Sequence, residues 1–267
     1  MKLIRQLIKK TFFPETNAAK PEKPTCKDYM EKIERLPDPL PNQLFCIDKC
    51  INCLEKIPGI LDPLEGYALF ELAKSGNASD PIAEVGSYLG KSASYMALGS
   101  LVAGKKGVVA IDMFPAKEDW FKGEDGLWHI HGSDYYLSES VYKEREHFFY
   151  GGSHYANTLD IFNDIVGKVN IRSHITAFKG NSSAYMEKPG RHAKFRMVFI
   201  DGDHTYQGVK KDIEALSGAI VPGGYICFHD YCSSFPGVIK AVDELILSSS
   251  AYQQRCLVRS LAVARKA

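Results

Sequence analysis

The chain has 267 residues, of which 45% are hydrophobic and 24% are charged. This composition is typical of a globular domain with one large core, and it excludes intrinsic disorder, a collagen helix and a coiled-coil rod. The 33 Lys and Arg residues against 32 Asp and Glu residues leave a net charge of +1, which gives no general attraction to nucleic acid. We therefore expect a folded protein without a nucleic-acid partner.

The N-terminal segment differs in composition from the rest of the chain. In Met1–Phe13, apolar residues at helical spacing alternate with Lys and Arg, which is typical of a basic helix on a membrane surface or, alternatively, of a surface helix or frayed tail. The residues from Pro14 to Pro41 are rich in Pro, Lys and Glu and indicate a linker or an extended arm. We assign residues 1–40 to this arm and residues 41–267 to the folded domain.

The cysteines and the hydropathy pattern indicate a cytoplasmic protein. No stretch approaches the roughly 18 apolar residues of a spanning helix, and the N-terminus lacks the features of a signal peptide. The seven cysteines contain no paired C-x-x-C motifs of the kind that form zinc sites. Cys50 and Cys53 form a single C-x-x-C motif within an apolar helical pattern, so we interpret them as buried small residues rather than a redox pair.

The periodicity of apolar residues alternates between helical and strand-like along the domain. Helices are predicted over residues 64–73, 92–102, 158–166, 205–216 and 237–247. Strands are predicted over residues 82–85, 108–111, 175–178, 197–200 and 225–228, with a Pro-Gly-Gly turn at 222–224 and one or two edge strands within 256–265. This alternation predicts a parallel sheet of the α/β class, and the continuous apolar strands indicate helices on both of its faces.

One segment, residues 113–156, interrupts the alternation. It is rich in Trp, Tyr, Phe and His, and it is too long for an ordinary connection. Because it follows the carboxyl end of a predicted strand, where doubly wound sheets bind ligands, we interpret it as a lid or a substrate-binding insertion. The alternative is an extra structural layer whose aromatic side chains pack on the body of the domain.

A glycine-rich motif lies where the first predicted strand turns into a helix. In A-E-V-G-S-Y-L-G-K-S, Gly86 and Gly90 allow a ligand to approach the backbone, and the helix that follows offers unpaired N–H groups. Only three residues separate the glycines, so this is not a phosphate-binding P-loop. Glu84 would repel a pyrophosphate and attract a cation, which favours a nucleotide-like ligand with an amino acid group. The alternative is a turn that only packs strand against helix.

Two further segments of the sequence fit such a ligand. Asp112 ends the second predicted strand, where a carboxylate can accept hydrogen bonds from ribose hydroxyls. Gly180, Asn181 and Ser182 follow the next strand and could border an adenine, although Asn181 alone would be interpreted as a helix cap.

The strongest motif pair is acidic and contains histidine. F-I-D-G-D-H-T-Y follows one strand and F-H-D-Y follows the next, so Asp201 and Asp230 are expected a few ångströms apart with His204 and His229 beside them. Two such carboxylates favour a divalent cation, with Mg²⁺ as the first expectation. His229 as a third ligand would favour Mn²⁺, Fe²⁺ or another transition metal. The alternative is that these residues only cap strands and a helix.

Taken in order, these motifs resemble those of the class I S-adenosylmethionine (SAM)-dependent methyltransferases. The match consists of E-V-G-S-Y-L-G-K-S, A-I-D-M-F, F-I-D-G-D-H-T-Y-Q-G-V-K-K-D, V-P-G-G-Y-I-C-F-H-D-Y and P-G-V-I-K-A-V-D-E-L. It is most similar to the small-molecule O-methyltransferase branch that includes the macrocin and cephalosporin-type enzymes. It covers residues 64–267 outside the aromatic insertion.

This resemblance implies a Rossmann-like, doubly wound sheet of about seven mostly parallel strands. It implies a methionyl site at the glycine motif, a ribose site at Asp112 and an adenine site after the next strand. The cofactor-binding residues expected are Glu84, Gly86, Ser87, Gly90, Ser92, Asp112, Gly180, Asn181, Ser182 and Asp201.

The resemblance also implies catalytic and metal-binding roles. Asp201, His229 and Asp230 would hold the metal, and His204 would act as the base, with a hydrogen bond to Asp203 or a place in the metal shell as its alternative role. At His229 the sequence departs from relatives that carry an acidic residue there. Transfer of a methyl group from a sulfonium to a hydroxyl requires alignment and a deprotonated oxygen, and these residues could provide both.

The expected function is therefore methyl transfer from SAM to a hydroxyl of a polar small molecule, with a sugar or glycan precursor as one candidate. A nicotinamide-dependent oxidoreductase is the first alternative, which Glu84 and the glycine spacing disfavour. A catalytically silent cofactor-binding protein is the second, which Asp201, His204 and Asp230 disfavour. Assembly into a homo-oligomer is left open.

Overall fold

The computed structural model describes residues 47–133, 135–150, 155, 157–190 and 194–267. The expected basic helix at Met1–Phe13, the linker that follows it and the start of the domain at residue 41 lie outside these ranges. No helix within the described ranges is long and apolar enough to cross a membrane.

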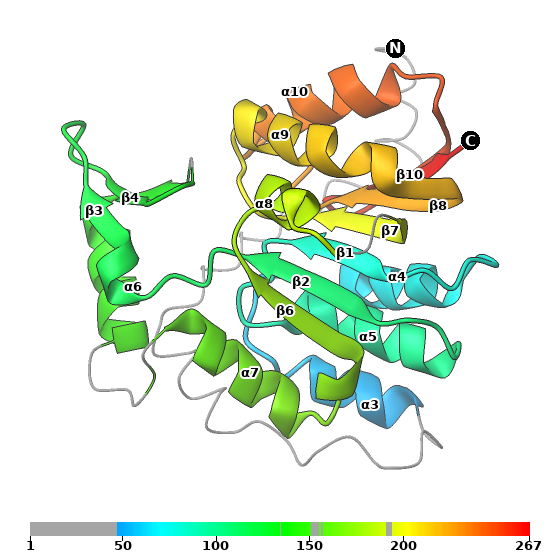
Figure 1. Ribbon diagram of the computed structural model, residues 1–267, viewed down its shortest axis with the longest axis horizontal. Coiled ribbons are helices and arrows are strands. Elements are labelled where there is room, and N and C mark those ends of the chain that lie inside the picture. The colour runs from blue at the N-terminus through cyan, green and yellow to red at the C-terminus, as the bar shows by residue number, and fades with distance from the viewer. Residues whose placement is uncertain (1–46, 134, 151–154, 156, 191–193) are drawn as a thin grey trace, which may run out of the picture.

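A mostly parallel sheet forms the centre of the protein (Figure 1). Within the described residues it has seven strands in the order β6-β2-β1-β7-β8-β10-β9. The strands are β1 Ile82–Val85, β2 Val108–Asp112, β6 Ile175–Lys179, β7 Phe195–Ile200, β8 Ile220–Phe228, β9 Tyr252–Val258 and β10 Leu261–Lys266. β10 runs antiparallel to β8 and to β9, whereas the other neighbouring strands are parallel. The doubly wound sheet expected from the sequence is confirmed.

Helices cover both faces of this sheet (Figure 1). One face carries α3 Ile47–Leu54, α4 Pro63–Lys74, α5 Lys91–Val102 and α7 Thr158–Lys168, and the other carries α8 Ser182–Glu187, α9 Tyr206–Leu216 and α10 Pro236–Val242. Each face has its own apolar core, one around Phe70, Tyr95 and Phe162 and the other around Val209 and Ile213. β1 and β7 are buried along their whole length, which explains their continuous apolar sequences.

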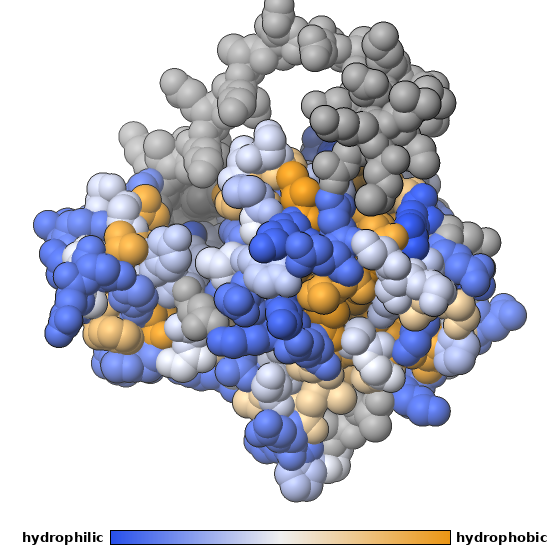
Figure 2. All heavy atoms as spheres, turned by 90° about the horizontal axis from the view of Figure 1, so that it is seen from above, coloured by the Kyte–Doolittle hydropathy of each residue, from blue (hydrophilic) through white to orange (hydrophobic). Residues whose placement is uncertain are grey.

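The outer side of the second helical layer is mostly polar. In Figure 2, which views the molecule from the side of α9 and α10, hydrophilic residues cover much of the described surface and hydrophobic residues show between them toward the middle. α9 follows this pattern, because it buries Val209, Ile213 and Leu216 and exposes Lys211 and Glu214.

The structure differs locally from the expected elements in two places. The expected turn at 222–224 is an irregular part of β8, where the pairing with β7 jumps from Phe195↔Ile220 to Met197↔Tyr225. The last expected helix ends as an α-helix at Val242 and continues as a π-helix over Asp243–Leu247. The edge strands expected near the C-terminus are present as β9 and β10.

The single C-x-x-C motif lies on α3, as its apolar pattern predicts. Cys50 is fully buried and Cys53 is partly buried. No disulfide links the cysteines of the described ranges.

The aromatic insertion forms a small structure beside the main body (Figure 1). Its described elements include β3 Trp120–Lys122, β4 Trp128–Ile130 and β5 Tyr136–Leu137, which pair in an antiparallel sheet, and α6 Glu139–Tyr150. It has its own apolar cluster of Trp120, Ile130, Leu137 and Tyr142, and the Trp128 and Tyr142 rings stack with their centroids 3.6 Å apart. Many of its aromatic side chains therefore pack on one another, and its role as a lid or substrate-binding insertion stays a prediction.

Candidate active site

The expected site residues lie at or near the carboxyl ends of β1, β2, β6, β7 and β8, or at the start of the segments that follow them, along one edge of the parallel sheet. Gly86, in the loop after β1, has a φ of +85°, which is in the left-handed region. A Cβ at this position would overlap the backbone of Asp201 and Gly202. A residue without a side chain therefore lets the loop after β1 lie directly against the loop after β7.

Glu84 lies beneath the glycine-rich loop and is fully buried. The Ser87 hydroxyl donates to its Oε2 at 2.6 Å, and the Ser92 hydroxyl donates to its Oε1 at 2.5 Å. Burial raises the pKa of Glu84 to about 8, and the two serine bonds oppose this shift. Glu84, Ser87 and Ser92 thus form one buried network that shapes the loop, and α5 begins after Gly90, whose φ is +86°.

Asp112 joins this loop to the end of β2. Its Oδ2 accepts a hydrogen bond from the backbone N–H of Tyr88 at 2.9 Å, and its Oδ1 accepts one from Phe114 at 2.7 Å. Burial raises the pKa of Asp112, and these backbone bonds oppose the rise. The carbonyl of Asp112 also accepts from the N–H of Gly180 at 2.8 Å, which brings the expected ribose and adenine segments together.

The side chains after β6 have structural partners of their own. Asn181 is the N-cap of α8, because its Oδ1 accepts from the N–H of Ala184 at 2.8 Å. The buried Ser182 hydroxyl donates to Oδ1 of Asp212 at 2.6 Å. The cap considered as an alternative for Asn181 is therefore present, and contact with a cofactor at these two residues stays a prediction.

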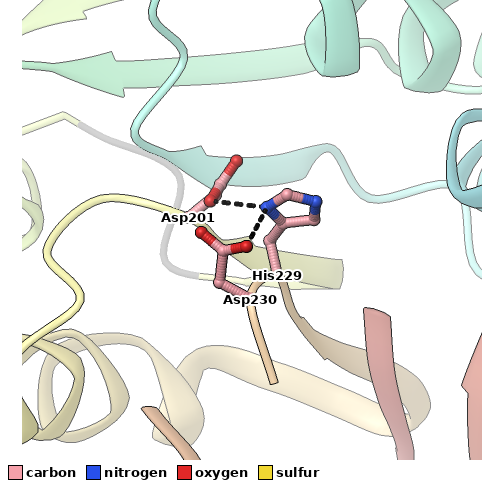
Figure 3. A group of neighbouring side chains, drawn as sticks. All are labelled: Asp201, His229 and Asp230. Atoms are coloured by element: carbon pink, nitrogen blue, oxygen red, sulfur yellow. Dashed lines mark hydrogen bonds and ion pairs between the residues drawn. The ribbon is translucent and has the colours of Figure 1, made fainter. Parts of the chain in front are cut away.

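The acidic and histidine residues after β7 and β8 form one cluster. Nδ1 of His229 faces both carboxylates, at 3.1 Å from Oδ1 of Asp201 and 3.6 Å from Oδ1 of Asp230 (Figure 3). Nε2 of His204 lies 3.3 Å from Oδ2 of Asp230 and 3.7 Å from Oδ1 of Asp201. The ring of Phe235 packs against His204, with centroids 4.5 Å apart.

Opposite charges dominate the electrostatics of this cluster. Burial would lower the pKa of His229, but the carboxylates around it outweigh that effect and raise the pKa to about 11. Burial is likewise outweighed at Asp201, whose pKa is lowered by His229 and His204. At Asp230 burial prevails and the pKa is raised. For His204 the two carboxylates outweigh burial, so its pKa is also raised.

Sequence reasoning missed Glu65, which lies in the first turn of α4. Its Oε2 is 3.0 Å from Nε2 of His229, and its Oε1 accepts from the backbone N–H of Ser260 at 2.7 Å. Burial opposes ionisation of Glu65, but His229 and Ser260 outweigh it and lower its pKa. The only sequence signal was a capping box with Asp62, which predicts a helix start and gives no indication of a contact with His229.

The donor set of this cluster fits a divalent cation. Asp201, His229 and Asp230 each offer one ligand atom, and these atoms lie within 4.8 Å of one another. Two carboxylate oxygens and an imidazole nitrogen are ligands that transition-metal dications accept. The residues expected from the sequence are therefore brought together, with His204 beside them.

The insertion reaches the glycine-rich loop through Tyr88. The guanidinium of Arg145 on α6 lies 5.8 Å from the centre of the Tyr88 ring and 5.7 Å from that of Tyr135. The Phe149 ring meets Tyr88 edge to face at 6.0 Å. The positive charge of Arg145 also opposes the burial that raises the pKa of Asp112. The insertion therefore adjoins the expected ribose site.

Comparison with known proteins identifies the class of this chain. A family model described as a methyltransferase domain matches residues 83–231, which is more than half of the chain. The chain therefore belongs to this methyltransferase family. The class I methyltransferase expected from the motifs is confirmed, and the oxidoreductase alternative loses its support.

Solved structures agree on the fold. An O-methyltransferase from Bacillus cereus in complex with S-adenosylhomocysteine (SAH) has a TM-score of 0.52 at 14% identity, covering 99% of this chain and 97% of its own. TomG, an O-methyltransferase from Streptomyces achromogenes in complex with SAM, has a TM-score of 0.51 at 11% identity, covering 99% and 96%. The O-methyltransferase NovP has a TM-score of 0.51 at 18% identity, covering 90% and 99%.

The buried Glu84 predicts a pH-dependent stability. Because its pKa is raised from 4.5 to about 8, the folded chain retains a proton there that the unfolded chain has released between these two values. The Glu84 contribution to the free energy of unfolding should therefore fall as the pH rises from about 5 to 8, by up to about 1.4 kcal/mol per pH unit. Glu84→Gln cannot ionise, so urea denaturation of this variant should show a flatter pH dependence over that window.

Glu118→Gln is the matched control, because Glu118 is exposed to solvent and its substitution should leave the wild-type slope unchanged. If Glu84→Gln follows the wild-type pH dependence as well, Glu84 is ionised in the folded protein and its assigned state is wrong.

Proposed function

We propose that this protein is an O-methyltransferase that transfers the methyl group of SAM to a hydroxyl of a polar small molecule with the help of a divalent metal. The observation that carries the proposal is the position of the Asp201, His229 and Asp230 cluster directly against the glycine-rich loop. Membership of the methyltransferase family supports the reaction class. The similar structures are O-methyltransferases, two of them in complex with SAH or SAM, which supports both the cofactor and the hydroxyl acceptor.

In this proposal the cofactor lies across the loops after β1, β2 and β6. SAM supplies a methyl group on a sulfonium, which a nucleophilic oxygen can attack in line. The backbone from Gly86 to Gly90 would hold the methionyl end, with Glu84, Ser87 and Ser92 fixing the shape of that loop. Asp112 would accept the ribose hydroxyls, because each of its oxygens retains a lone pair beside its backbone bond. Residues 180–182 would border the adenine.

Asp201, His229 and Asp230 would hold the metal in this proposal. A divalent cation there supplies positive charge that lowers the pKa of an acceptor hydroxyl. His204 would take the hydroxyl proton at Nε2, and its place beside Asp201 and Asp230 puts it within reach of an acceptor at the metal. The ion pairs of His204 with these two carboxylates, which raise its pKa, support a structural role as the alternative.

In this proposal the insertion binds the acceptor. Phe121 and Tyr136 are large aromatic residues with 40% and 50% of their surface exposed, and flat rings can stack on the apolar face of a sugar. A sugar or glycan precursor is therefore the acceptor class we favour. A cytoplasmic location remains part of the proposal, since no disulfide links the cysteines of the described ranges to one another.

Substitution of the proposed metal ligands should separate chemistry from cofactor binding. Asp201→Asn and Asp230→Asn should each reduce SAH production by at least about 100-fold in a screen with small hydroxyl acceptors, because the metal charge and the aligned oxygen are lost. Both variants should still be stabilised by SAH, and not by NAD, in thermal unfolding, because a ligand that binds only the native state raises its stability.

Asp160→Asn is the control for this experiment, since Asp160 is exposed on α7 and is not among the residues assigned to the metal or the cofactor. Wild-type SAH production by both ligand variants would refute the metal assistance. Undiminished production by His204→Ala in the same assay would remove the base from the mechanism.

The insertion should determine affinity for the acceptor. Tyr136→Ala removes an exposed ring on β5 while leaving the loop after β1 intact, so it should raise the KM for the acceptor and leave the Kd for SAH unchanged. The exposed apolar residue Leu64 on α4 offers a control substitution outside the insertion, Leu64→Ala, which should change neither constant. An unchanged acceptor KM in Tyr136→Ala would contradict acceptor binding at this strand.

A further inference from the structure

Glu65 is the most completely bonded carboxylate of the cluster. Its side chain is 2% exposed, and Oε1 accepts from both the N–H and the hydroxyl of Ser260, at 2.7 and 2.8 Å. Oε2 accepts from the N–H of Asp62 at 3.1 Å and lies 3.0 Å from Nε2 of His229. Three separate parts of the chain therefore fix this carboxylate. It is directed at the imidazole and lies outside the set of three ligand atoms.

The contact between Glu65 and His229 determines which ring nitrogen of His229 is available to a ligand. With Nε2 held by Glu65, Nδ1 points the other way, between Asp201 and Asp230 (Figure 3). The side chain of His229 is 5% exposed, so the ring has little room to turn. A carboxylate that accepts the second N–H of an imidazole is the usual means by which proteins orient a metal-binding histidine.

We propose that Glu65 is a positioning residue that presents Nδ1 of His229 as a nitrogen ligand, so that the site binds transition-metal dications in preference to Mg²⁺. This inference rests on the metal-assisted function proposed above and replaces Mg²⁺ as the expected ion. Mg²⁺ prefers an all-oxygen environment and retains several waters, whereas imidazole is a good ligand for Mn²⁺, Co²⁺ and Zn²⁺. The acidic residue that the resembling enzymes carry at this place needs no partner of this kind.

The alternative is that Glu65 and His229 form a structural ion pair within the core. Such a pair would need one carboxylate on the ring, yet the two nitrogens of His229 face three carboxylates, from Glu65, Asp201 and Asp230. Asp201 and Asp230 also retain 20% and 18% exposure, so the Nδ1 side of the ring is the side that solvent and ions can reach. The two interpretations predict different metal binding.

The test is a titration of the chelator-treated full chain with Co²⁺, followed by visible absorption and repeated in competition with Mg²⁺. The wild-type chain should bind Co²⁺ with a visible band, and a tenfold excess of Mg²⁺ should displace little of it. Glu65→Gln should weaken Co²⁺ binding by about 10- to 100-fold and shift the band, as expected when the partner of a metal-binding histidine is lost. The effect on Mg²⁺ affinity should be smaller.

Glu71→Gln is the matched control, because Glu71 lies on the same helix and pairs with Lys74 at the surface. It should bind Co²⁺ like the wild type. Glu65 also caps α4, so Glu65→Gln must be shown to fold by circular dichroism. If it does not fold, Ser260→Ala removes one donor to Glu65 while keeping the carboxylate, and it should weaken Co²⁺ binding in the same direction.

The outcomes distinguish this inference from the function on which it rests. Equal affinity of the wild type for Mg²⁺ and Co²⁺, or unchanged Co²⁺ binding in folded Glu65→Gln, would overturn the role of Glu65 and leave metal assistance standing. If the wild type binds neither Mg²⁺ nor Co²⁺, both the role of Glu65 and the metal assistance are overturned. Loss of Co²⁺ binding in Asp201→Asn, together with weakened binding in Glu65→Gln, would support both.

Discussion

The contact between Gly86 and the backbone of Asp201 determines how the rest of the site is assembled. Because residue 86 has no side chain and adopts a positive φ, the loop after β1 lies directly on the loop after β7. The loop proposed to bind the cofactor and the loop that carries Asp201 are therefore in direct contact. An in-line transfer requires this proximity, since its rate depends on holding the two reacting groups in contact and aligned.

The second organising feature is the chain of contacts from Ser260 through Glu65 and His229 to Asp201. It connects the turn between β9 and β10 with the start of α4 and with the ends of β8 and β7. A buried network of charges is stable only when each member has partners, and each of these groups has them. The same network turns Nδ1 of His229 toward Asp230, so the structural role of Glu65 and its proposed role in metal selection have one geometric origin.

Much of this architecture could be predicted because it follows from local patterns. Continuous apolar strands such as β7 and the turn at Gly86 have sequence signals that depend on a few neighbouring residues. The convergence of Asp201 and Asp230 follows from the topology of a parallel sheet. The partnership of Glu65 with His229 could not be predicted, because it spans 164 positions and depends on how α4 packs against the sheet. The three short strands of the insertion were missed because its aromatic residues lack a clear period.

Isothermal titration of the purified full chain with SAM, before and after chelation of divalent metals, tests the central claim most directly. The arrangement of the loops after β1 and β2 predicts saturable binding of one SAM per chain. Binding should persist after chelation, because Asp112 and the glycine-rich loop are held by protein hydrogen bonds alone. Absence of SAM binding under both conditions would contradict the claim that this edge of the sheet is a methyltransferase site.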